Sequence, residues 1–215
     1  IAELRDSFAG LADSPEDGFL LGAAVNQAET VAGKLNDLGS LITQMRNDAQ
    51  DEIAVSVEKI NQTLREIAEA NKEIKLNKVS GKTTAALEDI RDQAVSRLSE
   101  ELEVSFFTRG DGVLVVQTSQ GVQLADERAE TLYFKKSAIG ATSAYPDSAN
   151  GIFVGGNPAA NPTAIDITTS GINGKLGAYI ELRDEIMPRQ MAMVDELARR
   201  ERRRHLCDWL YQKRP

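Results

Sequence analysis

One short pattern, an acidic residue, an aliphatic residue, an arginine and an aspartate, occurs three times in the chain. It is ELRD at 3–6, DIRD at 89–92 and ELRD at 181–184. Arginine is charged at all ordinary pH values and carries a planar fork of donors that binds a carboxylate through two bonds. It is therefore a poor general base and a good clamp, so the pattern favours ion pairing over proton transfer.

The second and third copies are the ones that we expect to matter, and the first is interpreted as chance or as the end of a longer helix. Successive residues of a helix point about 100° apart, so an adjacent Arg and Asp should neither hold one substrate group nor pair with each other. We expect ion pairs between neighbouring helices instead, at a joint of a helical bundle. The predicted joint residues are Arg91, Asp92, Arg183 and Asp184. The sequence does not indicate which residues contact other subunits.

The residues most often used in catalysis are missing from most of the chain. His205, Cys207 and Trp209 are the only residues of their types. Residues 1–198 therefore offer no thiol nucleophile, no disulfide and no histidine-based metal site. We predict a protein that is not an enzyme, with no catalytic residue, no metal and no cofactor. An enzyme that uses carboxylates of the strand-forming region is the alternative.

Two further motifs have a structural and a functional interpretation. RGD at 109–111 is either an integrin ligand or a hairpin turn in which Gly110 and Gly112 relax the backbone, and the turn is favoured. The stretch GIFVGGNPAANP at 151–162 is rich in glycine but lacks a following Lys-Ser or Lys-Thr. It is therefore a poor candidate for a phosphate-binding loop.

Charge is distributed unevenly. Residues 199–215 hold seven Lys or Arg and two acidic residues, a net charge of +5 against −8 for the whole chain, so residues 1–198 carry −13. An acidic body argues against nucleic acid or a membrane as a partner. The basic tail at 199–215 is either a nucleic-acid-binding segment or a non-native, vector-derived or out-of-frame sequence. The first ten residues lack the features of a signal peptide and suggest the middle of a helix in a fragment.

A spacing of three and four between apolar residues predicts one very long helix over about 16–78. Ser14 is the expected N-cap and Pro15 the first helical residue. The spacing slips by one residue between Met45 and Val57. The stripe passes through Ala28, Val31, Leu35, Leu38, Ile42, Met45, Ala49, Ile53, Val57, Ile60, Leu64, Ile67, the polar Asn71 and Ile74. Other helices must cover this stripe.

The remaining elements predict a mainly α fold with a small β element. We expect an elongated antiparallel helical bundle into which a β-hairpin or small sheet is inserted. Residues 1–102 should form the bundle with a second helix at about 84–102. Residues 103–170 should form the β element and a loop rich in Gly, Asn and Pro. Residues 171–198 should return as a helix that Pro188 kinks or breaks, followed by the tail.

Three segments in order resemble the flagellar hook-associated protein 1 family, the junction protein between hook and filament. FAGLADSPED is followed by AETVAGKLNDLGSLI, then by LEDIRDQAVSRLSEELEVSFFTRGDGVLVVQ, and last by GKLGAYIELRDEIMPRQMAMVDELA. The resemblance covers about 1–198. The family's terminal rod and leucine-rich segments and its outer domain have no counterpart in this sequence, so we expect impaired polymerisation.

The resemblance implies a structural component of the bacterial flagellum, extracellular and exported by a type III pathway without a cleaved signal. Its implied partners are other copies of itself, hook protein, the filament-side junction protein and, through the missing C-terminal segment, an export chaperone. One alternative is another axial protein, such as the filament-side junction protein or a flagellin. Another is a secreted or receptor-like helical bundle that binds a ligand at its loops.

Overall fold

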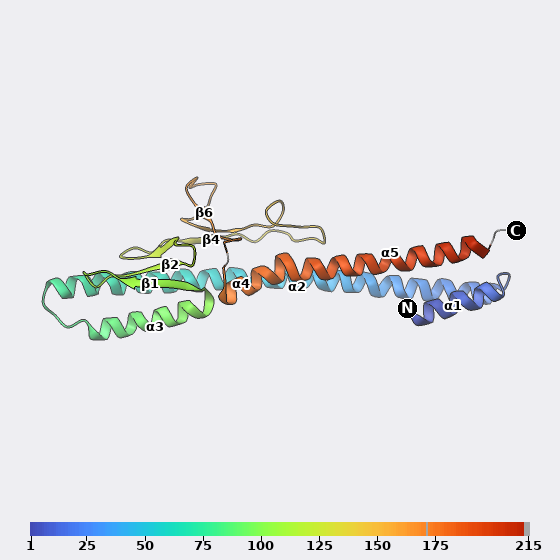
Figure 1. Cartoon of the computed structure of the whole chain (residues 1–215), viewed down its shortest axis with the longest axis horizontal. Coiled ribbons are helices and arrows are strands. Elements are labelled where there is room, and N and C mark those ends of the chain that lie inside the picture. The colour runs from blue at the N-terminus through green and yellow to red at the C-terminus, as the bar shows by residue number, and fades with distance from the viewer. Residues whose placement is uncertain (171, 213–215) are drawn as a thin grey trace. The chain divides into compact units, whose positions relative to one another are not determined.

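The computed structural model describes residues 1–170 and 172–212, with side chains as far as Arg203. The tail residues His205, Cys207 and Trp209 have side chains outside the described part. The helices are α1 (Ala2–Asp13), α2 (Gly18–Val79), α3 (Ala85–Glu101), α4 (Gly174–Glu181), the π-helix η1 (Leu182–Ile186) and α5 (Met187–Gln212). The strands are β1 (Val104–Thr108), β2 (Leu114–Thr118), β3 (Gln123–Ala125), β4 (Leu132–Phe134), β5 (Ile152–Val154) and β6 (Ile165–Asp166) (Figure 1). The predicted mainly α fold with a small β part is confirmed.

The chain divides into two compact units. One is formed by Ile1–Met45 together with the chain from Ile186 onward, and the other by Arg46–Glu185. The first unit contains α1, the first part of α2 and α5. The second contains the rest of α2, α3, both sheets and α4. The domain boundaries expected from the sequence stay a prediction.

The long helix α2 spans 62 residues, and its N-terminal cap differs from the expected one. Asp17, not Ser14, caps the helix, because its Oδ1 accepts the backbone N–H of Phe19 at 2.8 Å and of Leu20 at 3.3 Å. The N–H of Asp17 bonds the carbonyl of Ser14 at 3.1 Å, so Ser14 begins a turn ahead of the helix. An aspartate fits the helix N-terminus better, since its charge also favours the positive end of the dipole.

In the second unit, α3 runs antiparallel to α2. Glu101 of α3 accepts a hydrogen bond from Ser56 at 2.5 Å, and Arg97 bonds Glu66, so later residues of α3 meet earlier residues of α2. Both helices contribute to a core that also includes side chains of the strands and Leu176 of α4. The fully buried residues Ile53, Ile60, Leu64 and Ile67 of α2 lie on one face, as their spacing predicted.

The β part consists of two three-stranded antiparallel sheets, where the sequence suggested one hairpin or small sheet. The first has the order β1-β2-β3 and the second β4-β5-β6. In the first sheet, Val104 lies opposite Thr118 and Thr108 opposite Leu114, which gives the hairpin expected around Gly112. The central strand β2 is mostly buried, whereas β1 is exposed at four of its five residues.

The predicted disturbance at Pro188 takes the form of the π-helix η1, directly before α5. Proline donates no backbone hydrogen bond and its ring crowds the carbonyl four residues earlier, so the preceding turn must widen or break. Five residues, Leu182–Ile186, form the wider turn and the chain continues as α5.

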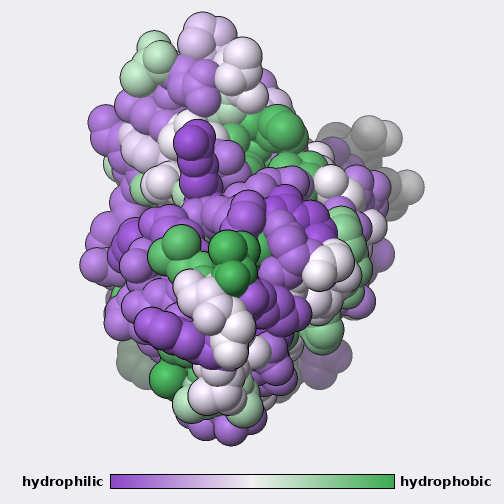
Figure 2. Space-filling model, turned by 90° about the vertical axis from the view of Figure 1, so that its left-hand side faces the viewer, coloured by the Kyte–Doolittle hydropathy of each residue, from purple (hydrophilic) through white to green (hydrophobic). Residues whose placement is uncertain are grey.

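None of the helices in the described residues is long and apolar enough to cross a membrane. Figure 2 shows the face at the left of Figure 1, where the chain turns from α2 into α3. This face is mainly hydrophilic, and its hydrophobic residues form small separated groups (Figure 2).

Candidate functional site: main-chain anchors on the long helix

Several carboxamide side chains of α2 hold other segments of the second unit by their main chain, among them those of Asn47, Gln50, Asn61 and Asn71. Asn61 donates from Nδ2 to the carbonyl of Leu132 at 2.8 Å and accepts the N–H of the same residue at 2.8 Å. Gln50 binds Ser137 in the same way, at 2.7 and 3.0 Å. Each carboxamide thus makes the two hydrogen bonds that a peptide group of a neighbouring strand would make, because it offers a donor and an acceptor in similar geometry.

Another of these carboxamides, Asn71, is fully buried and holds two segments at once. Its Oδ1 accepts the N–H of Leu114 at 2.9 Å, and its Nδ2 donates to the carbonyls of Leu114 and Asp126, each at 2.8 Å. Residues 50, 61 and 71 are 11 and 10 positions apart, about three helical turns each, so they lie along one side of α2. The anchors therefore attach β2, β4 and the loop after β4 to a single helix face.

Arg46 extends this series at the start of the second unit. Its side chain is buried and donates three hydrogen bonds to backbone carbonyls: Nε to Arg183 at 2.9 Å, Nη1 to Gly140 at 3.1 Å and Nη2 to Ser143 at 2.6 Å. Burial lowers the pKa of its guanidinium, Asp184 acts in the opposite direction, and the charge of Arg183 lowers this pKa further. Arg46 thereby holds the loop at Gly140 and Ser143 in place, since moving the loop away would leave buried hydrogen-bonding groups without partners.

Arg183 and Asp184, two of the predicted joint residues, pair with each other. Arg183 is fully buried, and its Nε and Nη2 donate to the two carboxylate oxygens of Asp184 at 2.9 and 2.7 Å. The expectation that adjacent Arg and Asp residues do not pair is therefore wrong here. Both lie in η1, and Arg5 likewise pairs with Asp6 at 3.4 Å in the regular helix α1, so the long arginine side chain reaches the adjacent carboxylate in either kind of turn. Arg183 also donates from Nη1 to the carbonyl of Asn150 at 3.1 Å and lies over the ring of Phe134, 5.7 Å from its centre.

Arg91 and Asp92, the other predicted joint residues, make a looser pair. Arg91 is buried in α3 and donates from Nη1 to the carbonyl of Gly112 at 3.0 Å, in the turn between β1 and β2. Its Nε lies 3.7 Å from the carboxylate of the exposed Asp92 and has no hydrogen-bond partner among the described residues. The main bond of Arg91 thus joins a helix to a hairpin turn, whereas the sequence suggested a carboxylate on another helix.

The RGD sequence forms the hairpin turn and its charges are engaged within the chain. Gly112 has φ +88°, in the region that favours glycine, whereas Gly110 has no positive φ, so only one of the two glycines is required by the backbone. Arg109 donates to Asp111 at 3.0 Å and to Glu127 at 2.6 Å, and Lys75 also bonds Glu127 at 2.6 Å. The hydrogen bond from Arg109 lowers the pKa of Asp111 to about 2.

These arrangements position the chain and bring no reactive groups together. The described residues contain no cluster of three or more His, Cys, Asp or Glu side chains placed to hold a metal ion. Most of the buried polar side chains among the described residues instead bond main-chain groups. The sequence analysis did not identify Arg46, Gln50, Asn61 or Asn71 as anchors. A partial signal lay in the slip of the apolar spacing between Met45 and Val57, since the buried line passes from Ile42 to Arg46 and leaves Met45 exposed.

Comparison with known proteins agrees with this structural character. The family description "Flagellar hook-associated protein FlgK helical domain" matches residues 1–200. Comparison with curated proteins gives no match. Among solved structures, the flagellar hook junction protein FlgK from Burkholderia pseudomallei is similar, with a TM-score of 0.69 and 24% sequence identity, and the match covers 84% of this chain.

The same match covers 31% of the Burkholderia chain, so this chain corresponds to about a third of that protein's length. At this identity the structural likeness supports the fold alone. The family rests on the match over residues 1–200, which confirms the resemblance found in the sequence motifs. The chain belongs to the family of the flagellar hook-associated protein FlgK, and the part that matches is the helical domain.

Proposed function

We propose that this chain is the helical domain of an extracellular axial protein that links hook to filament in the bacterial flagellum. The observation that carries the proposal is the match of the FlgK helical domain over residues 1–200. The role is structural and needs no catalysis. It is performed by packing between subunits.

The geometry suits a part that carries load. A helix of 62 residues measures about 93 Å at 1.5 Å per residue, and α2 is of this length. The anchors at Gln50, Asn61 and Asn71 bind main-chain groups, so they hold the strands against α2 along the direction of the helix. Hydrogen bonds of this kind limit sliding of one element past another, which apolar contacts alone resist weakly because they are not directional.

Arg91, Asp92, Arg183 and Asp184 are proposed as the joints of the fold. Arg183 with Asp184 ties the π-helix to the loop that precedes β5, and Arg91 ties α3 to the turn at Gly112. Their role in this proposal is to keep the helices and the sheets in register. They contact no substrate.

The partners proposed from the family are further copies of this protein, hook protein and the filament-side junction protein. An export chaperone is a further proposed partner. Export through the flagellar pathway without a cleaved signal is part of the same proposal. The location is the outside of the cell, within the flagellum.

The test is made in the bacterium that encodes the chain. Deleting the codons for residues 1–200 should leave hooks without filaments, with filament subunits released into the medium, because nothing then attaches them to the hook. Electron microscopy of the cell surface and swimming in soft agar measure the outcome. The exchange Gln62→Ala, at an exposed position of α2, is the matched control and should preserve filaments. A deletion strain with attached filaments and normal swimming contradicts the proposal.

A further inference from the structure

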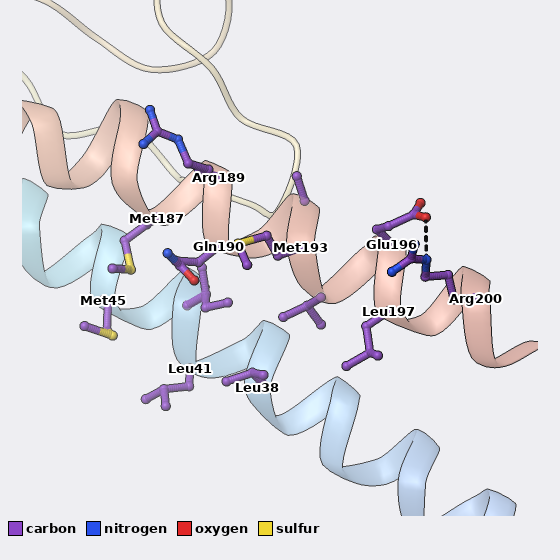
Figure 3. A pocket seen from close by; sticks show the side chains of 13 residues that line it. Leu38, Leu41, Met45, Met187, Arg189, Gln190, Met193, Glu196, Leu197 and Arg200 are labelled. Atoms are coloured by element: carbon purple, nitrogen blue, oxygen red, sulfur yellow. Dashed lines mark ion pairs between the residues drawn. The ribbon is translucent and has the colours of Figure 1, made fainter. Parts of the chain in front are cut away.

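An apolar groove of about 720 Å³ lies between α2 and α5 in the first unit (Figure 3). Leu38, Leu41 and Met45 line it from α2, and Met193 and Leu197 are among the residues that line it from α5. Met193 is 62% exposed and Leu41 is 51% exposed. Side chains of this size and exposure, collected along one groove, mark a surface that is normally covered by a partner.

The composition of the groove fits a helix as its occupant. All four methionines of the chain lie at this place: three line the groove, and the fourth, Met191, lies beside Gly39, where an added Cβ would be 3.7 Å from its sulfur. Methionine is flexible and polarizable, so it adapts to the side chains of an inserted helix. A channel between two antiparallel helices receives a third helix that carries apolar residues at intervals of three and four.

The chain itself presents such a stripe on another side of α2. Leu21 and Val25 are 51% and 47% exposed, and Ala28 and Ala32 continue the same spacing of four, three and four residues. This stripe points in a different direction around α2 from Leu38, Leu41 and Met45. One helix therefore carries both a groove wall and a separate exposed apolar stripe.

Charge supports a match between the stripe and the groove. Residues 6–33, which contain the stripe, hold five acidic residues and no Lys or Arg. The rim of the groove carries Arg189 and Arg200, with Glu196 pairing to Arg200 at 3.5 Å across one exposed turn (Figure 3). An apolar stripe within an acidic segment is attracted to a rim with a net positive charge, and this favours the pairing of stripe with groove.

We propose that the groove between α2 and α5 binds the Leu21–Val25 stripe of a second copy of this chain. The two surfaces differ, so the contact is heterologous and leaves one free groove and one free stripe on every pair. Such a contact repeats from copy to copy. This contact would be one of the subunit contacts that the proposed function requires, and in that respect it rests on the proposed function. It can be measured separately, with the isolated chain.

The test uses sedimentation velocity of the purified chain over a range of concentrations. The unaltered chain should self-associate, and Met193→Glu in the groove or Val25→Glu in the stripe should each weaken the association about tenfold or more. Ile90→Glu, at an equally exposed isoleucine of α3 in the other unit, is the matched control and should associate as the unaltered chain does. Equimolar Met193→Glu and Val25→Glu chains, each monomeric alone, should form a dimer of one of each and nothing larger.

That mixture separates the outcomes. A dimer in the mixture supports the heterologous contact, and two chains that stay monomeric when mixed overturn it. An unaltered chain that stays monomeric, or an Ile90→Glu chain that loses association equally, also overturns it. A second readout does not require a charged substitution: Leu21→Cys with Leu41→Cys, in a Cys207→Ser background, should cross-link between copies under mild oxidation, whereas Ile90→Cys with Leu41→Cys should not. If these association tests fail, the subunit contact is wrong, whereas the proposed function is tested independently by the filaments of the deletion strain.

Discussion

Replacing Asn71 by leucine tests whether the main-chain anchors hold the strands on α2. Leucine has the same number and branching of side-chain heavy atoms as asparagine, so the exchange leaves position 71 filled. It removes the carboxamide that bonds the N–H and carbonyl of Leu114 and the carbonyl of Asp126. The side chain is fully buried, so water does not reach the freed groups without local opening.

The magnitude follows from these three bonds. A buried polar group left without a partner costs about 1–3 kcal/mol, so three such groups amount to about 3–9 kcal/mol before relaxation. The carbonyl of Asp126 is only partly buried and will regain water. We therefore expect the free energy of unfolding of the second unit to fall by about 3 kcal/mol, a large share of the 5–15 kcal/mol of an ordinary domain.

Urea unfolding followed by circular dichroism measures this loss, and amide hydrogen exchange at Leu114 locates it. The hydrogen-exchange measurement is needed because the chain has two compact units, so one urea transition need not report on the unfolding of the second unit. Gln62→Ala is the control, since Gln62 makes one exposed bond to Glu66 and should change stability by less than about 0.5 kcal/mol. A loss below about 1 kcal/mol for Asn71→Leu, with protection of the Leu114 amide unchanged, would refute the reasoning.

Three further predictions concern the charged residues. Arg183→Ala should destabilise the second unit by about 3–5 kcal/mol in urea unfolding, because it leaves the carboxylate of Asp184 unpaired near the core, whereas Arg200→Ala at the surface should cost under about 1 kcal/mol. Arg46→Met should cost about 3 kcal/mol in the same assay, since three backbone carbonyls lose their donor, and equal stability would contradict it. The folded-state pKa of Asp111 is lowered to about 2 from 3.8, so its stabilising effect is present above pH 4 and is lost as the pH falls towards 2. Asp111→Asn should therefore flatten the dependence of stability on pH between 4 and 2, and an unchanged slope in acid unfolding would contradict this.

The long helix was predictable because its apolar spacing reflects a physical requirement that continues for many turns. The expected range of about 16–78 compares with the observed Gly18–Val79. The hairpin was equally clear, since two short runs rich in β-branched and aromatic residues flank Gly110-Asp111-Gly112, and Gly112 supplies the backbone angle of the turn. Signals of this kind are local, and the residues that carry them are neighbours in the sequence or on one helix face.

The anchors were not predictable in the same way, because their partners are 43 to 137 residues away. A polar residue such as Gln50 looks like any solvated position until another segment covers it. The Arg183–Asp184 pair was mispredicted because the angle between adjacent helix positions does not limit a side chain as long as arginine: Arg5 and Asp6 also pair, at 3.4 Å, in the regular helix α1. The capping error at Ser14 has a similar origin, since Ser14 and Asp17 both satisfy the local rule and the turn between them decides.

The carboxamide anchors also bear on how such a domain can diverge in evolution. Asn61 and Gln50 recognise the peptide groups of Leu132 and Ser137, which every residue except proline possesses, and not the side chains at those positions. The anchored segments are thus free to exchange their side chains, provided that the buried ones stay apolar, while the attachment to α2 persists. Side chains on a surface that contacts new partners can therefore be substituted one at a time, while the backbone of the anchored segments keeps its position on α2.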